Sequence, residues 1–162
     1  MAKILIIEDQ PVLCRLYKSV LERHGHDVTL AESGEAGIEA ARRTAPDLVI
    51  LDLILPVMPG AQVARQLRDE GILDKAPLIV TTGMGEEDMR TIAESLGASG
   101  VLSKPFDIGS MLDVVRRTLE FPAQTTSCAL ARITTVHRIY RGATIPSWRL
   151  LFLQFGEPAN VL

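Results

Sequence analysis

Four charged residues, each just after an apolar run, carry the chemistry that this sequence can support. Glu8 and Asp9 follow the first such run, Asp52 follows another, and Lys104 follows a third. Carboxylate oxygens are the ligands that hard divalent cations prefer, and an ammonium group binds phosphoryl oxygens. Brought together, these residues would form a site for a divalent cation and a phosphoryl group.

The apolar runs predict the elements that must position these residues. The runs are short and nearly continuous, which is typical of strands buried on both faces of a parallel sheet. The functional crevice of such a sheet lies just beyond the carboxyl ends of its strands. A further run, 78–82, ends in Thr82 and adds a hydroxyl. One charged residue after a strand is most simply a loop residue, but four polar strand ends that suit one chemistry favour a site.

Length and composition indicate a soluble globular protein with one domain and an appendage. The chain has 162 residues, of which 47% are hydrophobic and 23% charged. We expect no signal peptide, because Lys3 precedes only four aliphatic residues, and no apolar stretch approaches the ~18 residues of a membrane helix. Cys14 and Cys128 are too few and too far apart for a metal cluster, and nothing argues for a disulfide. The natural setting is a reducing cytoplasm.

Charge divides the chain near residues 121 and 122. The first part has a net charge of −6, whereas the part from Pro122 onward has a net charge of +3 and four of the seven aromatic residues. We therefore predict a domain at 1–121 and, at 122–162, a linker with a short, basic, poorly ordered tail. An acidic domain argues against direct binding of nucleic acid by that domain, since cations supply that affinity.

Strand and helix patterns alternate through the first part. Strands are predicted at 3–8, 27–31, 48–52, 77–81 and 100–103. Helices are predicted from Pro11 to a stop at Gly25, over 35–43 with Ser33 as N-cap, from about 60 to 70, over 86–96 and over 107–119. This order predicts an α/β fold with an open, doubly wound, five-stranded parallel sheet flanked by five helices.

The motifs at the strand ends resemble a known family. The segments 51–60 and 97–106, with the acidic pair at 8–9, look like a response-regulator receiver domain of two-component signalling. The resemblance covers residues 3–120 and is closest in kind to a chemotaxis-regulator-like single receiver with a short C-terminal extension. It implies a flavodoxin-like sheet with strand order 2-1-3-4-5.

The resemblance also implies roles for individual residues. Asp52 would be the nucleophile that accepts a phosphoryl group from a phosphohistidine and forms an acyl phosphate. Lys104 would pair with Asp52 and then with a phosphoryl oxygen, and the Thr82 hydroxyl would bind another oxygen. The bond before Pro105 is expected to be cis.

A Mg²⁺ ion is implied as the cofactor. By the family's pattern, Asp9 and Asp52 bind it directly, Glu8 binds it mostly through water, and the backbone carbonyl of Ile54 completes the protein ligands. An apolar side chain at position 54 is compatible with this role, because only its main chain is used.

Two departures from the family pattern change what is expected of the switch. Val101 stands where receivers usually carry an aromatic residue, so we hypothesise that output relies on the loop after Thr82 and the helix from Glu86 to Leu96. Ile54 and Met84, which the pattern places beside the acyl phosphate, are both apolar. Neither side chain can hold an attacking water, and slow self-dephosphorylation is expected.

Partners follow from the resemblance as well. We expect a sensor histidine kinase or histidine phosphotransfer protein as donor, a downstream protein as target, and a monomer or weak dimer. The chain would not be an enzyme beyond self-phosphotransfer and slow autodephosphorylation. An alternative is that the basic tail is itself the output and contacts a membrane or nucleic acid. A metal-dependent phosphohydrolase is disfavoured, because that class needs a second carboxylate where this chain has Ile54.

Overall fold

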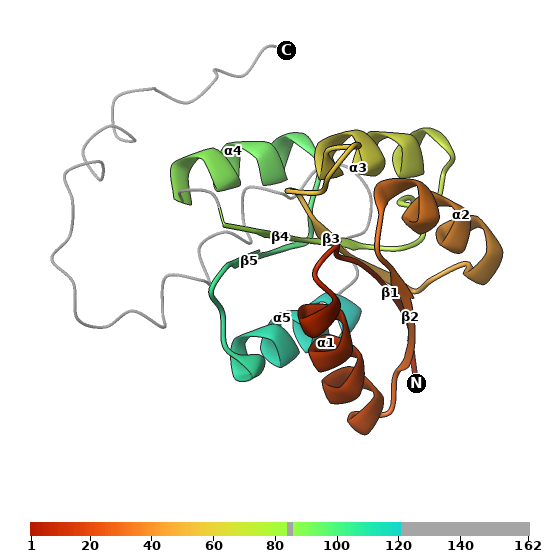
Figure 1. Cartoon of the computed structure of the whole chain (residues 1–162), viewed down its shortest axis with the longest axis vertical. Coiled ribbons are helices and arrows are strands. Elements are labelled where there is room, and N and C mark those ends of the chain that lie inside the picture. The colour runs from red at the N-terminus through yellow and green to blue at the C-terminus, as the bar shows by residue number, and fades with distance from the viewer. Residues whose placement is uncertain (84–85, 121–162) are drawn as a thin grey trace, which may run out of the picture. The chain divides into compact units, whose positions relative to one another are not determined.

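The computed structural model describes residues 1–83 and 86–120 and contains one parallel sheet (Figure 1). The strand order is β2-β1-β3-β4-β5, and a helix follows every strand. The strands are β1 (Lys3–Ile7), β2 (Asp27–Ala31), β3 (Leu48–Asp52), β4 (Leu78–Thr82) and β5 (Gly100–Ser103). The helices are α1 (Pro11–Arg23), α2 (Gly34–Thr44), α3 (Gly60–Asp69), α4 (Glu86–Ser95) and α5 (Ile108–Glu120). The predicted fold and strand order are confirmed.

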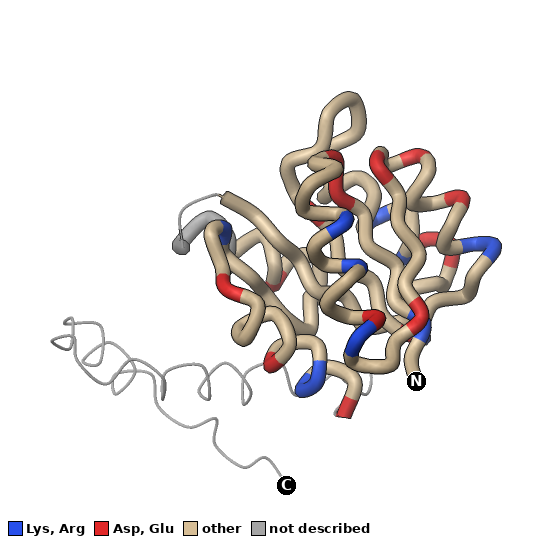
Figure 2. Tube along the Cα trace, turned by 60° about the horizontal axis from the view of Figure 1, so that its bottom comes forward, with Lys and Arg blue, Asp and Glu red and all other residues tan. Residues whose placement is uncertain are grey.

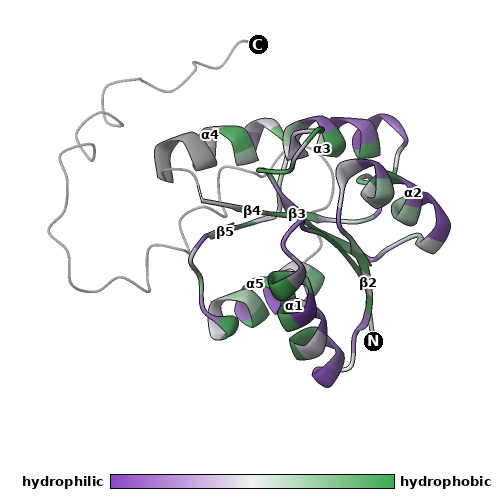
Figure 3. Cartoon of the chain, viewed as in Figure 1, coloured by the Kyte–Doolittle hydropathy of each residue, from purple (hydrophilic) through white to green (hydrophobic). Residues whose placement is uncertain are grey.

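Helices cover both faces of the sheet, which explains why the strands are apolar at almost every position. Helices α1 and α5 lie on one face, and α2, α3 and α4 lie on the other (Figure 1). Along β1, Ile4 and Ile6 pack into the core on the α1–α5 face, and Leu5 and Ile7 pack into the core on the opposite face. In Figure 3, the central strands are coloured green, as hydrophobic residues are, whereas the helices mix green with purple.

Strand register aligns the polar ends of three strands. Ile7 of β1 pairs with Leu51 of β3, so the next residues, Glu8 and Asp52, stand level at the carboxyl edge of the sheet. On the other side of β3, Thr82 pairs with Ser103, the residue before Lys104. The order of the strands and their register therefore bring Lys104 to the same edge as Asp52, 52 residues earlier in the chain, and Glu8, 96 residues earlier.

The predicted element boundaries are correct to within one or two residues, and local hydrogen bonds explain the differences. Strand β4 extends to Thr82, one residue beyond the prediction. Helix α5 begins at Ile108 because Asp107 caps it, accepting a hydrogen bond of 2.9 Å from the backbone N–H of Ser110. The predicted cap of α2 is confirmed: the Ser33 hydroxyl accepts from the N–H of Ala36 at 3.2 Å.

Some predictions lie outside the described residues. These include the proposed boundary at 121–122, the basic tail at 122–162 and Met84. Within residues 1–83 and 86–120, no helix combines the length and the apolar character that crossing a membrane requires.

The loop between β3 and α3 contains a strained residue. Val57 has φ 67°, in the left-handed region, and its side chain is 94% exposed. A β-branched side chain is disfavoured in this region because its Cβ approaches the following carbonyl oxygen. The strain is not offset by burial of the side chain.

Replacing Val57 with Asn is expected to stabilise the protein, because Asn tolerates the left-handed conformation far better. The free energy of unfolding, measured by urea denaturation, is expected to rise by about 0.5–1 kcal/mol. Val12→Asn, at an exposed position in helix α1, is the matched control and is expected to be neutral or slightly destabilising. Equal effects of the two substitutions would show that backbone strain at Val57 is not the cause.

Candidate functional site

Three carboxylates meet at the carboxyl edge of the sheet. Ligand oxygens of Glu8, Asp9 and Asp52 all lie within 4.8 Å of one another. Glu8 is 1% exposed and Asp52 3% exposed, whereas Asp9 is half-buried and reaches solvent. Buried like charges repel strongly, so this cluster needs cations to neutralise it.

Lys104 supplies one of those cations. Its ammonium lies 2.6 Å from Glu8 Oε2 and 2.6 Å from Asp52 Oδ2. Its backbone N–H donates to the carbonyl oxygen of Thr82 at 2.7 Å, which fixes the start of the β5–α5 loop against the end of β4. The Lys104–Pro105 bond is cis, as expected. The predicted lysine therefore reaches the predicted acceptor and also the first acidic strand end.

In Glu8 and Lys104, burial and hydrogen bonding shift the pKa in opposite directions. Burial raises the pKa of Glu8 above its ordinary value, although the hydrogen bond from Lys104 acts in the other direction. For Lys104, burial alone would lower the pKa, but the hydrogen bonds to Asp52 and Glu8 outweigh it and raise the pKa. The charged form of Lys104 is thus favoured, whereas the ionised form of the buried Glu8 is disfavoured.

The loop after β3 orients the Asp52 side chain. The backbone N–H of Ile54 donates to Asp52 Oδ1 at 2.9 Å, while Oδ2 faces Lys104. The same loop folds back on the strand at Gly60, whose N–H donates to the carbonyl oxygen of Leu53 at 3.1 Å. A Cβ on Gly60 would lie 2.1 Å from the backbone oxygen of Asp52, so only glycine permits this approach.

Thr82, Val101 and Ile54, which the sequence also singled out, differ in how deeply they are buried. Thr82 is the last residue of β4 and is fully buried. Val101 is half-buried and packs against the core on the α2–α4 face. The Ile54 side chain is 57% exposed beside the acidic cluster.

The sequence predictions missed one aromatic contact near the site. Tyr17 of α1 stacks on Phe106, with ring centroids 5.5 Å apart and an interplanar angle of 23°. Sequence spacing could have suggested that Phe106, two residues after Lys104, lies near the site, but not which helix meets it.

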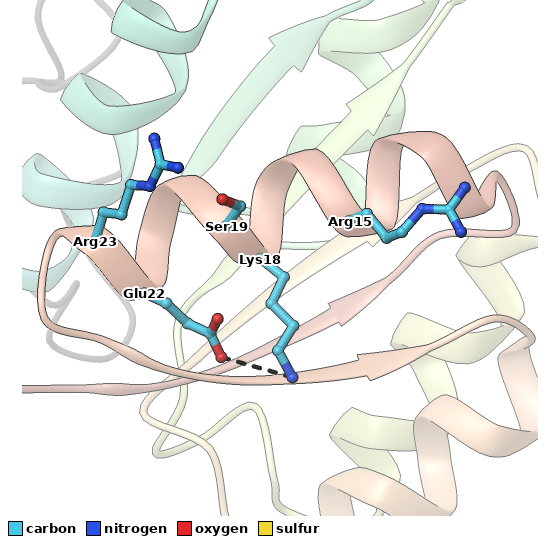
Figure 4. A pocket seen from close by; sticks show the side chains of 5 residues that line it. All are labelled: Arg15, Lys18, Ser19, Glu22 and Arg23. Carbon is cyan, nitrogen blue, oxygen red and sulfur yellow. Dashed lines mark ion pairs between the residues drawn. The ribbon is translucent and has the colours of Figure 1, made fainter.

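A shallow hollow on the outer face of α1 is separate from the acidic cluster (Figure 4). Its lining consists of helix-surface residues, including Arg15 and an exposed ion pair between Lys18 and Glu22 at 3.6 Å. Such an exposed pair contributes little to stability. Figure 2 shows Lys and Arg interspersed with Asp and Glu over the described chain rather than gathered on one basic face. The described residues therefore present the sheet edge as their best candidate site.

Comparisons with known proteins agree with this geometry. The sequence model of the response regulator receiver domain matches residues 4–116. Protein PilH of Pseudomonas aeruginosa is 34% identical over 119 residues, which cover 74% of this chain and 98% of PilH. The KDP operon transcriptional regulatory protein KdpE of Escherichia coli is 36% identical over 127 residues, which cover 78% of this chain and 55% of KdpE. The chain spans about half the length of several such curated relatives.

Solved structures show the same fold. The chemotaxis protein CheY4 of Vibrio cholerae superposes with a TM-score of 0.68 at 26% identity, covering 72% of this chain and 98% of that one. The BeF3-activated N-terminal receiver domain of Klebsiella pneumoniae RstA gives a TM-score of 0.65 at 30% identity, covering 72% of this chain and 97% of that one. Because the family match extends over well more than half of the sequence and its motifs fall on the acidic sheet edge, the chain belongs to the response regulator receiver domain family of two-component systems.

Proposed function

We propose that this chain is a phosphoacceptor that relays the output of a histidine kinase through a phosphorylated Asp52. The observation that carries this proposal is the ion pair of Lys104 with Asp52 and Glu8, both at 2.6 Å, inside a cluster of three carboxylates. Phosphoryl transfer depends on positioning and charge neutralisation more than on acid–base chemistry. The sheet edge supplies the positioning and, through Lys104, part of the charge neutralisation.

The acidic cluster fits a hard divalent cation, and Mg²⁺ is the proposed cofactor. The cluster offers only oxygen ligands, and the half-buried Asp9 leaves one side open to water. Mg²⁺ prefers a few carboxylate oxygens with several retained waters. Glu8, Asp9, Asp52 and the Ile54 carbonyl would hold the ion, which supplies charge neutralisation for the incoming phosphoryl group.

The side chains then have separate tasks in the transfer. A carboxylate oxygen of Asp52 attacks phosphorus, a new oxygen–phosphorus bond forms, and the phosphorus–nitrogen bond to the donor histidine breaks with its electron pair returning to the imidazole. Lys104, already beside Asp52 Oδ2, follows the developing charge on the phosphoryl oxygens. The Thr82 hydroxyl is proposed to bind a second phosphoryl oxygen.

Exposed apolar residues around the site support a protein as the phosphodonor. Apart from Met1, the large exposed apolar residues of the described chain lie in the first two turns of α1, in the β3–α3 loop and at the first residue of α5: Val12, Leu16, Ile54, Val57 and Ile108. Apolar residues that surround a polar site are typical of protein interaction surfaces. A kinase or phosphotransfer protein that carries phosphohistidine is the donor that fits.

The proposed output is binding of a downstream protein. Since Val101 is aliphatic, the movement proposed to signal phosphorylation is that of the loop after Thr82 and of helix α4. The chain would act in the cytoplasm as a monomer or weak dimer, with no enzymatic activity beyond accepting and slowly losing its own phosphoryl group. The alternative, that residues 122–162 contact a membrane or nucleic acid directly, is tested by deleting them.

Asp52→Asn is expected to abolish phosphorylation while preserving the fold. The amide is nearly isosteric with the carboxylate but is not a nucleophile, and Lys104 keeps its partner Glu8. Labelling by acetyl phosphate with Mg²⁺ is measured by intact-protein mass and by acid-quenched gel assay. Asp113→Asn on the exposed face of α5 is the control and should be labelled as the parent is. Stable label on another residue of the Asp52→Asn protein would refute the assignment.

Asp9→Asn is expected to weaken Mg²⁺ binding and to stabilise the metal-free protein. A charged carboxylate ligand is replaced by a neutral amide oxygen, so affinity is expected to fall by at least about tenfold, equivalent to about 1.4 kcal/mol. Relief of repulsion in the cluster is expected to add about 1 kcal/mol to the free energy of unfolding without metal, after discounting for solvent screening. Isothermal titration and urea denaturation measure the two effects.

Asp27→Asn is the matched control for Asp9→Asn. Asp27 is exposed at the start of β2, at the opposite edge of the sheet, and both quantities should stay at parent values there. An Asp9→Asn protein with parent Mg²⁺ affinity would exclude Asp9 as a ligand.

Ile54→Asn is expected to shorten the lifetime of the acyl phosphate. The side chain is half-exposed beside the cluster and offers no group that can orient a water molecule. An amide there is expected to speed hydrolysis by about three- to tenfold, below the ~10²–10⁴ of a full general base. Decay is followed by ³²P loss after removal of the donor, and Val57→Asn in the same loop is the control. A decay rate within error of the parent would show that apolar shielding does not set the lifetime.

A further inference from the structure

The loop that carries Lys104 is held at three places. At its start, the N–H of Lys104 donates to the Thr82 carbonyl oxygen. At its end, Asp107 caps α5 through the N–H and the hydroxyl of Ser110, at 2.9 and 2.7 Å. Between these points, Phe106 stacks on Tyr17. The first two contacts join the loop to β4 and α5, and only the third joins it to α1.

Helix α1 is the element that follows the acidic pair directly. It begins at Pro11, two residues after Asp9, and Tyr17 lies in its second turn with only 5% of its surface exposed. The stack therefore connects the helix that follows Glu8 and Asp9 to the loop that holds Lys104. Burial, the largest cause, raises the pKa of Tyr17 to about 12, and the nearby charges of Lys104, Glu8 and Asp52 also act on its hydroxyl.

The stack is also on an unexpected face of the sheet. The family resemblance places an aromatic residue at position 101, where Val101 packs into the core on the α2–α4 face. Tyr17 and Phe106 instead belong to the core on the α1–α5 face. The aromatic contact of Tyr17 with Phe106 thus lies on the face of the sheet opposite to Val101.

We propose that Tyr17 is a positioning residue that acts through Phe106 to hold the ammonium of Lys104 between Glu8 and Asp52. The ring of Tyr17 limits where Phe106 can lie, and Phe106 is two residues from Lys104. Because Lys104 must be within hydrogen-bonding distance of the phosphoryl oxygens, a small displacement of the loop slows transfer. This inference rests on the proposed phosphoacceptor function.

The test compares Tyr17→Leu, Phe106→Leu and the double variant with the parent chain. The rate of Asp52 labelling is measured at saturating acetyl phosphate and Mg²⁺, together with Mg²⁺ affinity. Each single variant is expected to lower the saturated rate by about three- to tenfold, and the double variant by no more than either single one, since both remove one contact. Mg²⁺ affinity is expected to stay within about twofold of the parent, because no ligand changes.

Two further variants separate positioning from general packing. Tyr17→Phe keeps the ring and is expected to label at the parent rate. Leu21→Val loosens the same core one turn further along α1, where Leu21 is fully buried, and is expected to lower stability but not the labelling rate. If Tyr17→Leu does not fold, the half-buried Phe106 allows the comparison to be made with Phe106→Leu and Phe106→Tyr, the latter expected to retain the parent rate.

The outcomes are distinguishable. Parent-like labelling of Tyr17→Leu or Phe106→Leu, equal slowing by Leu21→Val, or multiplied effects in the double variant would each overturn the positioning role alone. A parent chain that takes no label at all would overturn the proposed function, and this inference with it.

Discussion

The structure of this site depends on the crowding of like charges at the edge of a sheet. Glu8, Asp9 and Asp52 lie within 4.8 Å of one another, and two of them are almost fully buried. With Lys104 included, the four ionised groups have a formal charge of −2. An anionic phosphoryl group would be repelled by this site until a divalent cation balanced it. The metal dependence proposed for phosphorylation would therefore be a matter of charge, because Lys104 alone does not balance the three carboxylates.

Much of this site could be predicted from the sequence because a parallel sheet converts order along the chain into position in space. Each buried strand is a short apolar run, and its first polar residue marks the carboxyl edge, so Glu8, Asp52 and Lys104 were correctly placed on one side. The Ser33 cap and the cis bond before Pro105 were predicted for similarly local or motif-based reasons.

Other features depend on contacts between segments and could not be predicted in this way. The pairing of Tyr17 with Phe106 depends on how α1 packs beside α5, which helical spacing alone does not fix. The left-handed conformation of Val57 contradicts its residue type and is imposed by the loop that joins β3 to α3. Strand β4 reaches Thr82 because pairing with β5 continues to Ser103, and no local signal marks that end.

Two glycines beside the site differ in the room that surrounds them. At Gly60, the chain lies so close to the backbone of Asp52 and Leu53 that a side chain has no room. At Gly83, directly after β4, a Cβ would meet no atom within 4 Å. A side chain at position 60 would therefore displace the backbone of the acceptor, whereas one at position 83 would enter open space. A single added methyl group would thus disturb the acceptor from the start of α3 but would be accommodated just after β4.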